Sequence, residues 1–386
     1  MDVRPFKIHV PEDVLEDLRH RLARTRWPDE IPGTGWEYGA NMAYMKELAE
    51  YWRTGFDWRA QEEALNAFSH FRADIDGLGI HFIHERGKGP DPLPIVVTHG
   101  WPGLFLEELN IIPLLTDPES HGGDPADSFD VVVPSLPGYG FSDSPTQRGV
   151  NHSRIAHLWT QIMTEGLGYR RFCAYGSDWG ASVTAHIGYN FPEQVMGIHM
   201  TSASGPQPYL GPGARELSDR ERAFIEERDE WQRDEGGYNH LQRTKPQTLS
   251  YGLNDSPVGL AAWIVDRIRT WGKGESDEEK RRRYTWDEVL TNVTIFWAAQ
   301  NMGASCRLYY ETAQSPWDLK QGERIQVPTA VAILAQDQTH APREWGERSF
   351  NVQRWTELPR GGHFPAWEEP QLLAEDLRAF FRQFRA

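Results

Sequence analysis

The chain of 386 residues is long enough for one large domain or two smaller ones, and its 39% hydrophobic residues can fill a sizeable core. The formal net charge of −16 argues against binding to nucleic acid or to an anionic membrane surface. Two cysteines are too few for a disulfide framework. No signal peptide is recognisable, and no apolar run reaches the roughly 18 residues that span a bilayer. We therefore expect a soluble, cytoplasmic protein.

The first ninety residues predict helices joined by turns, followed by a strand. Apolar residues recur at helical spacing after Pro11, and again between Met45 and Trp52. The run 80–84 is typical of a strand that enters a sheet. We expect residues 1–90 to form a region that wraps the core.

From residue 93 onward, short apolar runs alternate with amphipathic helices. This alternation predicts an α/β fold, with a mostly parallel sheet and helices on both faces. Buried strands are expected at 95–97, 131–133 and 172–175, and each is followed by a loop at its carboxyl end. Ligand sites of open α/β sheets form at that end.

The βα alternation stops between residues 205 and 320, where charged residues, Trp and Tyr are frequent. This stretch predicts a helical lid inserted over the sheet. The alternation resumes with the apolar run 330–334 and closes with an amphipathic helix. We therefore assign residues 91–204 and 321–386 to the core.

The segment from Gly176 to Gly180 has the pattern of a nucleophile elbow centred on Asp178. Small residues lie two positions before and after Asp178, and a strained turn between strand and helix needs them there. Ser177 is off-centre, because its corresponding neighbours would be Tyr175 and Trp179, which are bulky. The alternative interpretation is an ordinary Asp that caps a helix. The spacing favours Asp178 as a nucleophile.

A histidine and an acid follow the elbow in the chain. His363 comes after two glycines, just before the last predicted helix. Asp337 follows the strand ending at Leu334, where the acid of a catalytic triad belongs, although Glu344 or Glu347 could take this role. The order nucleophile, acid, histidine is that of the α/β-hydrolase fold, which we therefore expect.

The loop 99–102, His-Gly-Trp-Pro, follows the first core strand and matches an oxyanion loop. The backbone N–H groups of Trp101 and Trp179 are expected to point at one oxygen that develops negative charge.

Together these motifs resemble the epoxide hydrolases, in particular the microsomal-type group that includes the insect juvenile-hormone enzymes. The similarity begins with the N-terminal stretch from Pro5 through 57–59 to 80–84. It continues through 253–262 and 290–293, so it covers essentially the whole chain.

The resemblance implies conversion of an epoxide to a vicinal diol through an ester on Asp178. His363, oriented by Asp337, activates the water that cleaves this ester. Two lid tyrosines, matched here by Tyr238 and Tyr309, protonate the epoxide oxygen. Neither a metal nor an organic cofactor is needed.

Three features depart from the family pattern. The elbow has Ser177 where Gly is commoner, and the acid is Asp337 where the relatives often carry Glu. The segment after His363 contains Pro365 and Trp367, which could reshape the pocket rim. Tyr310 is the neighbour with which the second lid tyrosine could be confused.

Three other functions are alternatives to epoxide hydrolysis. A haloalkane or fluoroacetate dehalogenase would share the carboxylate, the histidine and the acid but would not need the tyrosines. A serine esterase would require Ser177 at the apex of the elbow, and a non-catalytic ligand-binding member would be expected to lack a triad residue.

The identity of the substrate is not apparent from the sequence. The tryptophan-rich lid suggests a bulky or aromatic epoxide, such as an intermediate of secondary metabolism. Relatives are often dimeric, and the sequence leaves monomer and homodimer open.

Overall fold

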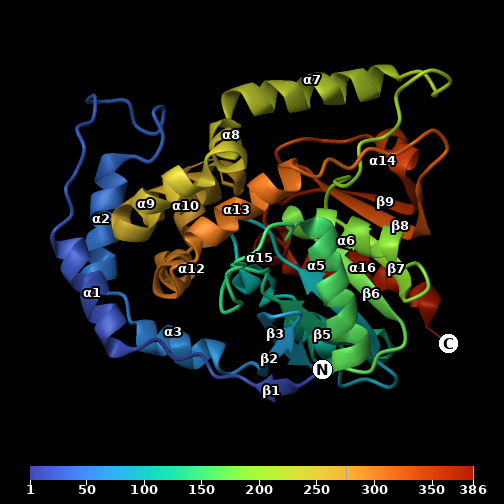
Figure 1. Cartoon of the computed structure of the whole chain (residues 1–386), viewed down its shortest axis with the longest axis horizontal. Coiled ribbons are helices and arrows are strands. Elements are labelled where there is room, and N and C mark those ends of the chain that lie inside the picture. The colour runs from blue at the N-terminus through green and yellow to red at the C-terminus, as the bar shows by residue number, and fades with distance from the viewer. Residues whose placement is uncertain (275, 386) are drawn as a thin grey trace.

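A nine-stranded sheet forms the centre of the computed structural model, which describes residues 1–274 and 276–385 (Figure 1). The strands lie in the order β1-β2-β3-β5-β4-β6-β7-β8-β9. Their bounds are β1 (Val3–Pro5), β2 (His70–Ile75), β3 (Leu78–Glu85), β4 (Leu93–Thr98), β5 (Phe129–Pro134), β6 (Phe172–Gly176), β7 (Val195–Met200), β8 (Ile325–Leu334) and β9 (Phe350–Leu358). Neighbours from β5 to β9 pair in parallel, which confirms the predicted mostly parallel sheet.

The central strands are largely apolar and buried, because helices cover both faces of the sheet. All six residues of β5 and all five of β6 are buried. Helix α6 packs on one face, and α4 and α16 pack on the other. The core helices are α4 (Ile112–Thr116), α5 (His152–Gln161), α6 (Trp179–Asn190), α14 (Arg343–Ser349), α15 (Pro365–Glu368) and α16 (Pro370–Phe381), with short turns η1 (Phe105–Glu108), η2 (Glu119–His121), η3 (Pro125–Asp127), η4 (Ile162–Gly166) and η5 (Arg382–Phe384).

The register of β4 and β6 brings two functional loops together. Thr98, the last residue of β4, lies opposite Gly176, the last residue of β6. The loop that starts at His99 and the turn that starts at Ser177 therefore leave the sheet side by side. A parallel pairing thus places segments that are far apart in the sequence at one edge.

The N-terminal residues form the predicted helices and two strands that the sequence analysis did not predict. The helices are α1 (Glu12–Ala23), α2 (Met42–Thr54) and α3 (Trp58–Leu65). The additional strands β1 and β2 pair antiparallel, and β2 continues antiparallel onto β3. They are short and half-polar, so pairing with the neighbouring strand, rather than their own pattern, defines them as strands.

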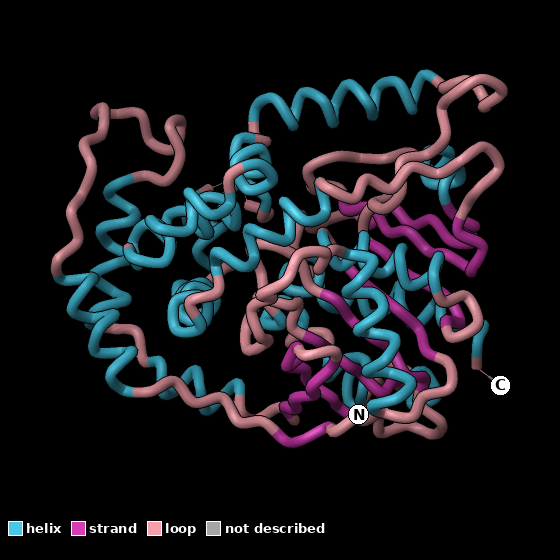
Figure 2. Tube along the Cα trace, viewed as in Figure 1, coloured by secondary structure: helices cyan, strands magenta, loops and turns pink. Residues whose placement is uncertain are grey.

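Within the described residues, seven helices lie between β7 and β8, in the stretch predicted to be a lid, and we keep the name lid for them. Figure 2 shows them grouped beside the strands rather than among them. They are α7 (Asp219–Asp234), α8 (Gly237–Thr244), α9 (Pro246–Asp255), α10 (Pro257–Trp271), α11 (Asp277–Arg283), α12 (Trp286–Ala299) and α13 (Met302–Ala313). Helix α7 is strongly polar and begins with a capping box between Ser218 and Glu221. None of the helices in residues 1–274 and 276–385 has the length and apolar character that crossing a bilayer requires.

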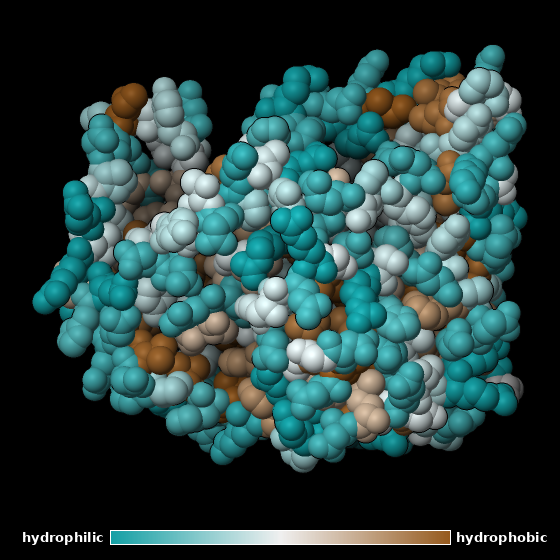
Figure 3. All heavy atoms as spheres, in the orientation of Figure 1, coloured by the Kyte–Doolittle hydropathy of each residue, from teal (hydrophilic) through white to brown (hydrophobic). Residues whose placement is uncertain are grey.

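The N-terminal helices pack against the lid, and in Figure 1 they stand beside α9, α10 and α12. The buried indole N–H of Trp52 donates a hydrogen bond of 3.0 Å to Thr294 Oγ1 on α12. Nearby, Tyr51 donates from its hydroxyl to Asp287 Oδ1 at 2.7 Å. The outer face shown in Figure 3 is mainly hydrophilic, in keeping with the strong net charge.

The contact between α2 and α12 leads to a stability prediction. Thr294→Val should lower the free energy of unfolding by about 1–3 kcal/mol, because the indole N–H of Trp52 would stay buried without an acceptor. Urea unfolding measures this difference. In a Trp52→Phe background the donor is absent, so the same Thr294 substitution should lower the free energy of unfolding much less. Equal costs in both backgrounds would contradict the role given to this hydrogen bond.

Candidate active site

Asp178 occupies the sharp turn between β6 and α6, with φ 48° and ψ −122°. A positive φ is uncommon for a residue with a side chain and costs on the order of 1–3 kcal/mol. The turn is also tightly packed. A Cβ at Gly176 would lie 2.2 Å from the carbonyl carbon of Gly180, and a Cβ at Gly180 would lie 1.9 Å from the carbonyl oxygen of Thr98. Glycines on both sides are thus a steric requirement of the elbow.

The oxyanion loop contacts the Asp178 carboxylate directly. The backbone N–H of Trp101 donates a hydrogen bond of 2.8 Å to Asp178 Oδ1. A Cβ at Gly100 would lie 2.3 Å from the Asp178 Cβ, so this loop can approach only because residue 100 is glycine. Trp179 follows Asp178 as the first residue of α6, and the contribution of its N–H to the oxyanion hole stays a prediction.

His363, in the loop between β9 and α15, lies between two carboxylates. Its Nδ1 is 2.9 Å from Asp337 Oδ1, and its Nε2 is 3.3 Å from Asp178 Oδ2. The imidazole is almost fully buried, with 9% of its side chain exposed. Burial alone would lower the pKa of His363, but the charges and hydrogen bonds of both carboxylates outweigh burial and hold this pKa well above its usual value.

The two alternative acids, Glu344 and Glu347, contact residues other than His363. Glu344 Oε1 accepts a hydrogen bond of 3.1 Å from the hydroxyl of Ser218, and Glu347 forms an ion pair with Arg343 at 2.7 Å. Asp337 is therefore the predicted acid that the structure brings to the histidine.

Both predicted lid tyrosines reach the elbow from helices of the lid. Tyr238 on α8 stacks on Trp101, with ring centroids 5.2 Å apart and planes 4° apart. Tyr309 on α13 meets the Trp179 ring edge-on at 4.5 Å, and the two tyrosine rings lie 6.0 Å apart. Tyr309 is 4% exposed, whereas Tyr310 is 37% exposed, so the helix turns only Tyr309 toward the elbow.

Both phenols are weaker acids than a phenol in water. Burial and the charge of Asp178 raise the pKa of Tyr238, and hydrogen bonding to Tyr309 and the positive charge of Arg267 partly oppose this rise. Burial, Tyr238 and Asp178 raise the pKa of Tyr309 well above its ordinary value. Each tyrosine therefore stays neutral and can donate a hydrogen bond at neutral pH.

Aromatic side chains of the lid enclose the triad. Trp271, the last residue of α10, meets Tyr238 at 5.0 Å and His363 at 5.1 Å, both edge-on. Trp231 on α7 lies half-buried at the outer side of this group, 6.4 Å from Trp271. The Asp178 carboxylate therefore lies within a site lined largely by apolar ring surface.

Glu107 is a carboxyl near the elbow that the sequence analysis did not single out. It lies on η1, and its Oε1 would be 1.5 Å from a Cβ at Gly103, so any side chain at residue 103 would displace the Glu107 carboxyl. Oε1 is buried without a hydrogen-bond partner among the described residues. Burial, together with the charge of Asp178, raises the pKa of Glu107 to about 8, although His363 opposes this effect.

At neutral pH Glu107 therefore carries a proton and adds no second negative charge beside the nucleophile. The sequence signal was an acidic pair inside an apolar segment just after the oxyanion loop. It could not distinguish Glu107 from Glu108, which is also buried and whose pKa is also raised, by burial and by Glu107.

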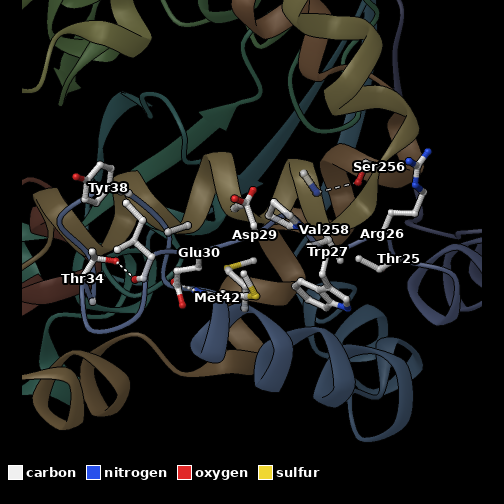
Figure 4. Close-up of a pocket in the computed structure, with 18 residues that line it drawn as sticks. Thr25, Arg26, Trp27, Asp29, Glu30, Thr34, Tyr38, Met42, Ser256 and Val258 are labelled. Carbon is white, nitrogen blue, oxygen red and sulfur yellow. Dashed lines mark hydrogen bonds between the residues drawn. The ribbon is translucent and has the colours of Figure 1, made fainter.

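The pocket drawn in Figure 4 is separate from this site. It lies between the loop that precedes α2 and the start of α10, and its volume is about 440 Å³. Trp27, Met42 and Val258 contribute its apolar lining, and no triad residue reaches it. Within the described part of the chain, no group of three or more His, Cys, Asp or Glu side chains is arranged to hold a metal ion.

Comparisons with known proteins agree with this geometry. The family model described as "Epoxide hydrolase N terminus" matches residues 3–108, and that of the alpha/beta hydrolase fold matches residues 94–370. A putative epoxide hydrolase of Stigmatella aurantiaca is 42% identical over 100% of this chain and 86% of its own length. Epoxide hydrolase 1 of Oryctolagus cuniculus is 36% identical over 98% of this chain and 88% of its own length.

Solved structures show the same likeness. The juvenile hormone epoxide hydrolase of the silkworm Bombyx mori superposes with a TM-score of 0.89 at 29% identity, covering 100% of this chain and 95% of its own. The Aspergillus niger epoxide hydrolase gives a TM-score of 0.86 at 28% identity, covering 99% and 97%.

The raised pKa of Glu107 leads to a prediction about stability and pH. The folded carboxyl holds its proton up to about pH 8, whereas the unfolded carboxyl loses it near its ordinary value of 4.5. Between these values the folded state binds more protons, so a rise in pH removes stability. In Glu107→Gln the free energy of unfolding should therefore fall less steeply as the pH rises. Urea unfolding at a series of pH values between 5 and 8 would measure this difference.

The exposed Glu63 provides the control, since Glu63→Gln should leave the pH dependence of unfolding unchanged. A Glu107 variant whose stability fell with pH as steeply as that of the parent protein would contradict the assignment of a neutral carboxyl.

Proposed function

We propose that this chain, which belongs to the epoxide hydrolase family and has the α/β-hydrolase fold, opens its epoxide by attack of Asp178 and cleaves the resulting ester with water activated by His363. One observation carries the proposal. The carboxylate of Asp178 has one oxygen bound to a backbone N–H and the other beside the imidazole, with two phenols nearby.

Ring opening requires a nucleophile and a proton donor on opposite sides of a C–O bond. Asp178 Oδ2 forms a bond to an epoxide carbon while the C–O bond to that carbon breaks. The departing oxygen takes a proton from one of the two phenols, which becomes a phenolate. The other carboxylate oxygen, Oδ1, becomes the ester carbonyl oxygen and keeps the N–H of Trp101 as its donor.

Formation of the ester changes the charge beside His363. Before the reaction two carboxylates stabilise the imidazolium, which is a poor base. Esterification neutralises Asp178 and leaves only the charge of Asp337, so the pKa of His363 falls during the cycle. The imidazolium can then give its proton to the phenolate formed in ring opening, and the neutral imidazole takes a proton from water at the moment when a base is needed.

The second half-reaction restores the enzyme. Hydroxide from the activated water adds to the ester carbonyl, and the N–H of Trp101, together with the predicted donor Trp179, stabilises the oxyanion. Collapse of this intermediate releases the diol and the carboxylate of Asp178. The proton taken from water restores the imidazolium of the resting enzyme, and the phenolate has already been reprotonated, so epoxide and water are converted to diol without net proton uptake.

The lining of the site supports a bulky or aromatic epoxide as the substrate. Rings of Trp101, Trp179, Trp231 and Trp271 surround the carboxylate and the phenols. Offset and edge-on packing against such rings favours apolar or aromatic substituents. The paired tyrosines favour an epoxide over a haloalkane, since a leaving halide needs no proton.

The two-step mechanism predicts that two substitutions fail differently. Asp178→Ala should never acquire substrate mass, whereas His363→Gln should form the ester and keep it, because only the second step needs the base. Intact-protein mass spectrometry after incubation with epoxide measures both outcomes. Ser177→Ala should retain most activity, because Ser177 lies beside the apex and not at it.

Isotope transfer provides a second measurement of the same mechanism. In ¹⁸O-water with excess enzyme, the first turnover should yield unlabelled diol and a labelled Asp178 peptide. Labelled diol in that turnover, with no adduct on the His363 variant, would contradict a covalent ester.

The two phenols lead to a further prediction. Tyr238→Phe and Tyr309→Phe should each slow ester formation, by about 10²–10⁴-fold for the residue that gives the proton. Rapid-quench measurement of ester formation follows this step. Tyr310→Phe is the matched control. Because Tyr310 is on the exposed side of α13, its substitution should leave the rate of ester formation unchanged. A damaging Tyr310 substitution with a silent Tyr309 substitution would refute the assignment.

A further inference from the structure

We propose that Arg267 is a positioning residue for ring opening, which holds Tyr238 in place, stabilises the charge on its phenolate and thereby makes it, rather than Tyr309, the proton donor. This inference rests on the proposed function, in which a lid phenol protonates the departing oxygen. Arg267 belongs to α10 and does not contact the triad.

The guanidinium of Arg267 faces the aromatic group from within the lid. Its central carbon is 5.5 Å from the centroid of the Tyr238 ring and 5.8 Å from that of Trp271. Only 13% of the side chain is exposed, so water screens this charge weakly. A guanidinium at such a distance from a ring is attracted by its electron density.

Two carboxylates hold the guanidinium in position. Glu235 accepts from Nη1 at 3.0 Å, and Asp266 accepts from Nη2. Glu235 is the last residue before the turn from α7 into α8, and Tyr238 is the second residue of α8. Arg267 therefore fixes the junction from which Tyr238 projects over the elbow.

The positive charge favours the state that forms during ring opening. When Tyr238 gives up its proton, negative charge spreads from the phenolate oxygen into the ring beneath the guanidinium. Attraction to this anion is stronger than attraction to the neutral ring, so Arg267 stabilises the transition state more than the ground state. The two carboxylates reduce the effect but leave its direction unchanged.

The two phenols are unequal in this respect. For Tyr238, Arg267 opposes the rise in pKa that burial and Asp178 produce. For Tyr309, burial and the surrounding groups Tyr238, Asp178, Tyr139 and Cys306 all act to raise the pKa. The charge of Arg267 therefore favours loss of the proton from Tyr238, and Tyr309 acts by hydrogen bonding to the epoxide oxygen or to Tyr238.

The experiment measures ester formation in the His363→Gln background, where the ester accumulates. Two epoxides are compared that differ only in CF₃ against CH₃ beside the carbon that bears the departing oxygen. The trifluoromethyl group makes the alkoxide a weaker base, so its departure depends less on protonation. Arg267→Gln removes the charge but can still donate to Glu235. We expect it to slow ester formation from the methyl epoxide by about tenfold and from the trifluoromethyl epoxide much less.

Three further variants complete the test. Arg267→Lys keeps the positive charge and should restore most of the rate. Arg269→Met removes a charge two residues along α10, over the Trp36 ring and away from the triad, and should leave both rates unchanged. If Arg267→Gln does not fold, Arg267→Met is measured with the same two epoxides.

Rates equal to those of the parent, or an equal loss with both epoxides, would overturn the inference, since a purely structural role slows both substrates alike. Tyr238→Phe in the same background separates this failure from that of the proposed function. If Tyr238→Phe forms the ester at the parent rate while Tyr309→Phe is slow, Tyr309 is the donor and only this inference fails. If neither substitution slows ester formation, protonation by a lid phenol, and with it that step of the proposed function, fails. If Tyr238→Phe is slow while Arg267→Gln is unaffected, only the role of Arg267 is lost.

Discussion

The position of one imidazole between two carboxylates is the constraint on which the site depends. His363 Nδ1 lies 2.9 Å from Asp337, and Nε2 lies 3.3 Å from Asp178. In a site enclosed by aromatic rings, each buried charge needs an opposite charge close by. The strained elbow, the closely packed glycines and the sheet register all act to hold Asp178 at this distance. The same arrangement makes the basicity of the imidazole depend on whether Asp178 is free or esterified.

Most of the sheet and the central triad could be predicted from the sequence, because these features rest on short-range patterns. An apolar run followed by small-x-Asp-x-small specifies both a strand end and a tight turn. The strands β1, β2, β7 and β9 were not predicted. In β1, β2 and β9, long-range pairing defines the strand more than its own composition does. Similarly, choosing Asp337 over Glu344 requires the path of a loop, which a single sequence does not contain.

Within the site, the sequence could not distinguish adjacent residues of the same chemical type. Tyr309 and Tyr310 follow each other on α13, as Glu107 and Glu108 do on η1. Successive residues on a helix point in directions about 100° apart, so only the orientation of the helix decides which one reaches the elbow. Arg267 could not be found from the sequence, because its importance comes from the ring that it faces across the lid.

The hydrogen bonds between α2 and α12 also restrict how the enzyme can open. A lid held from its outer side by a separate layer of helices is not free to swing as one rigid flap. Motion of α12 away from the site would have to break these contacts or carry α2 with it. Redesign of such an enzyme for larger epoxides would therefore begin with the aromatic side chains that line the site, while the contacts between α2 and α12 are kept intact.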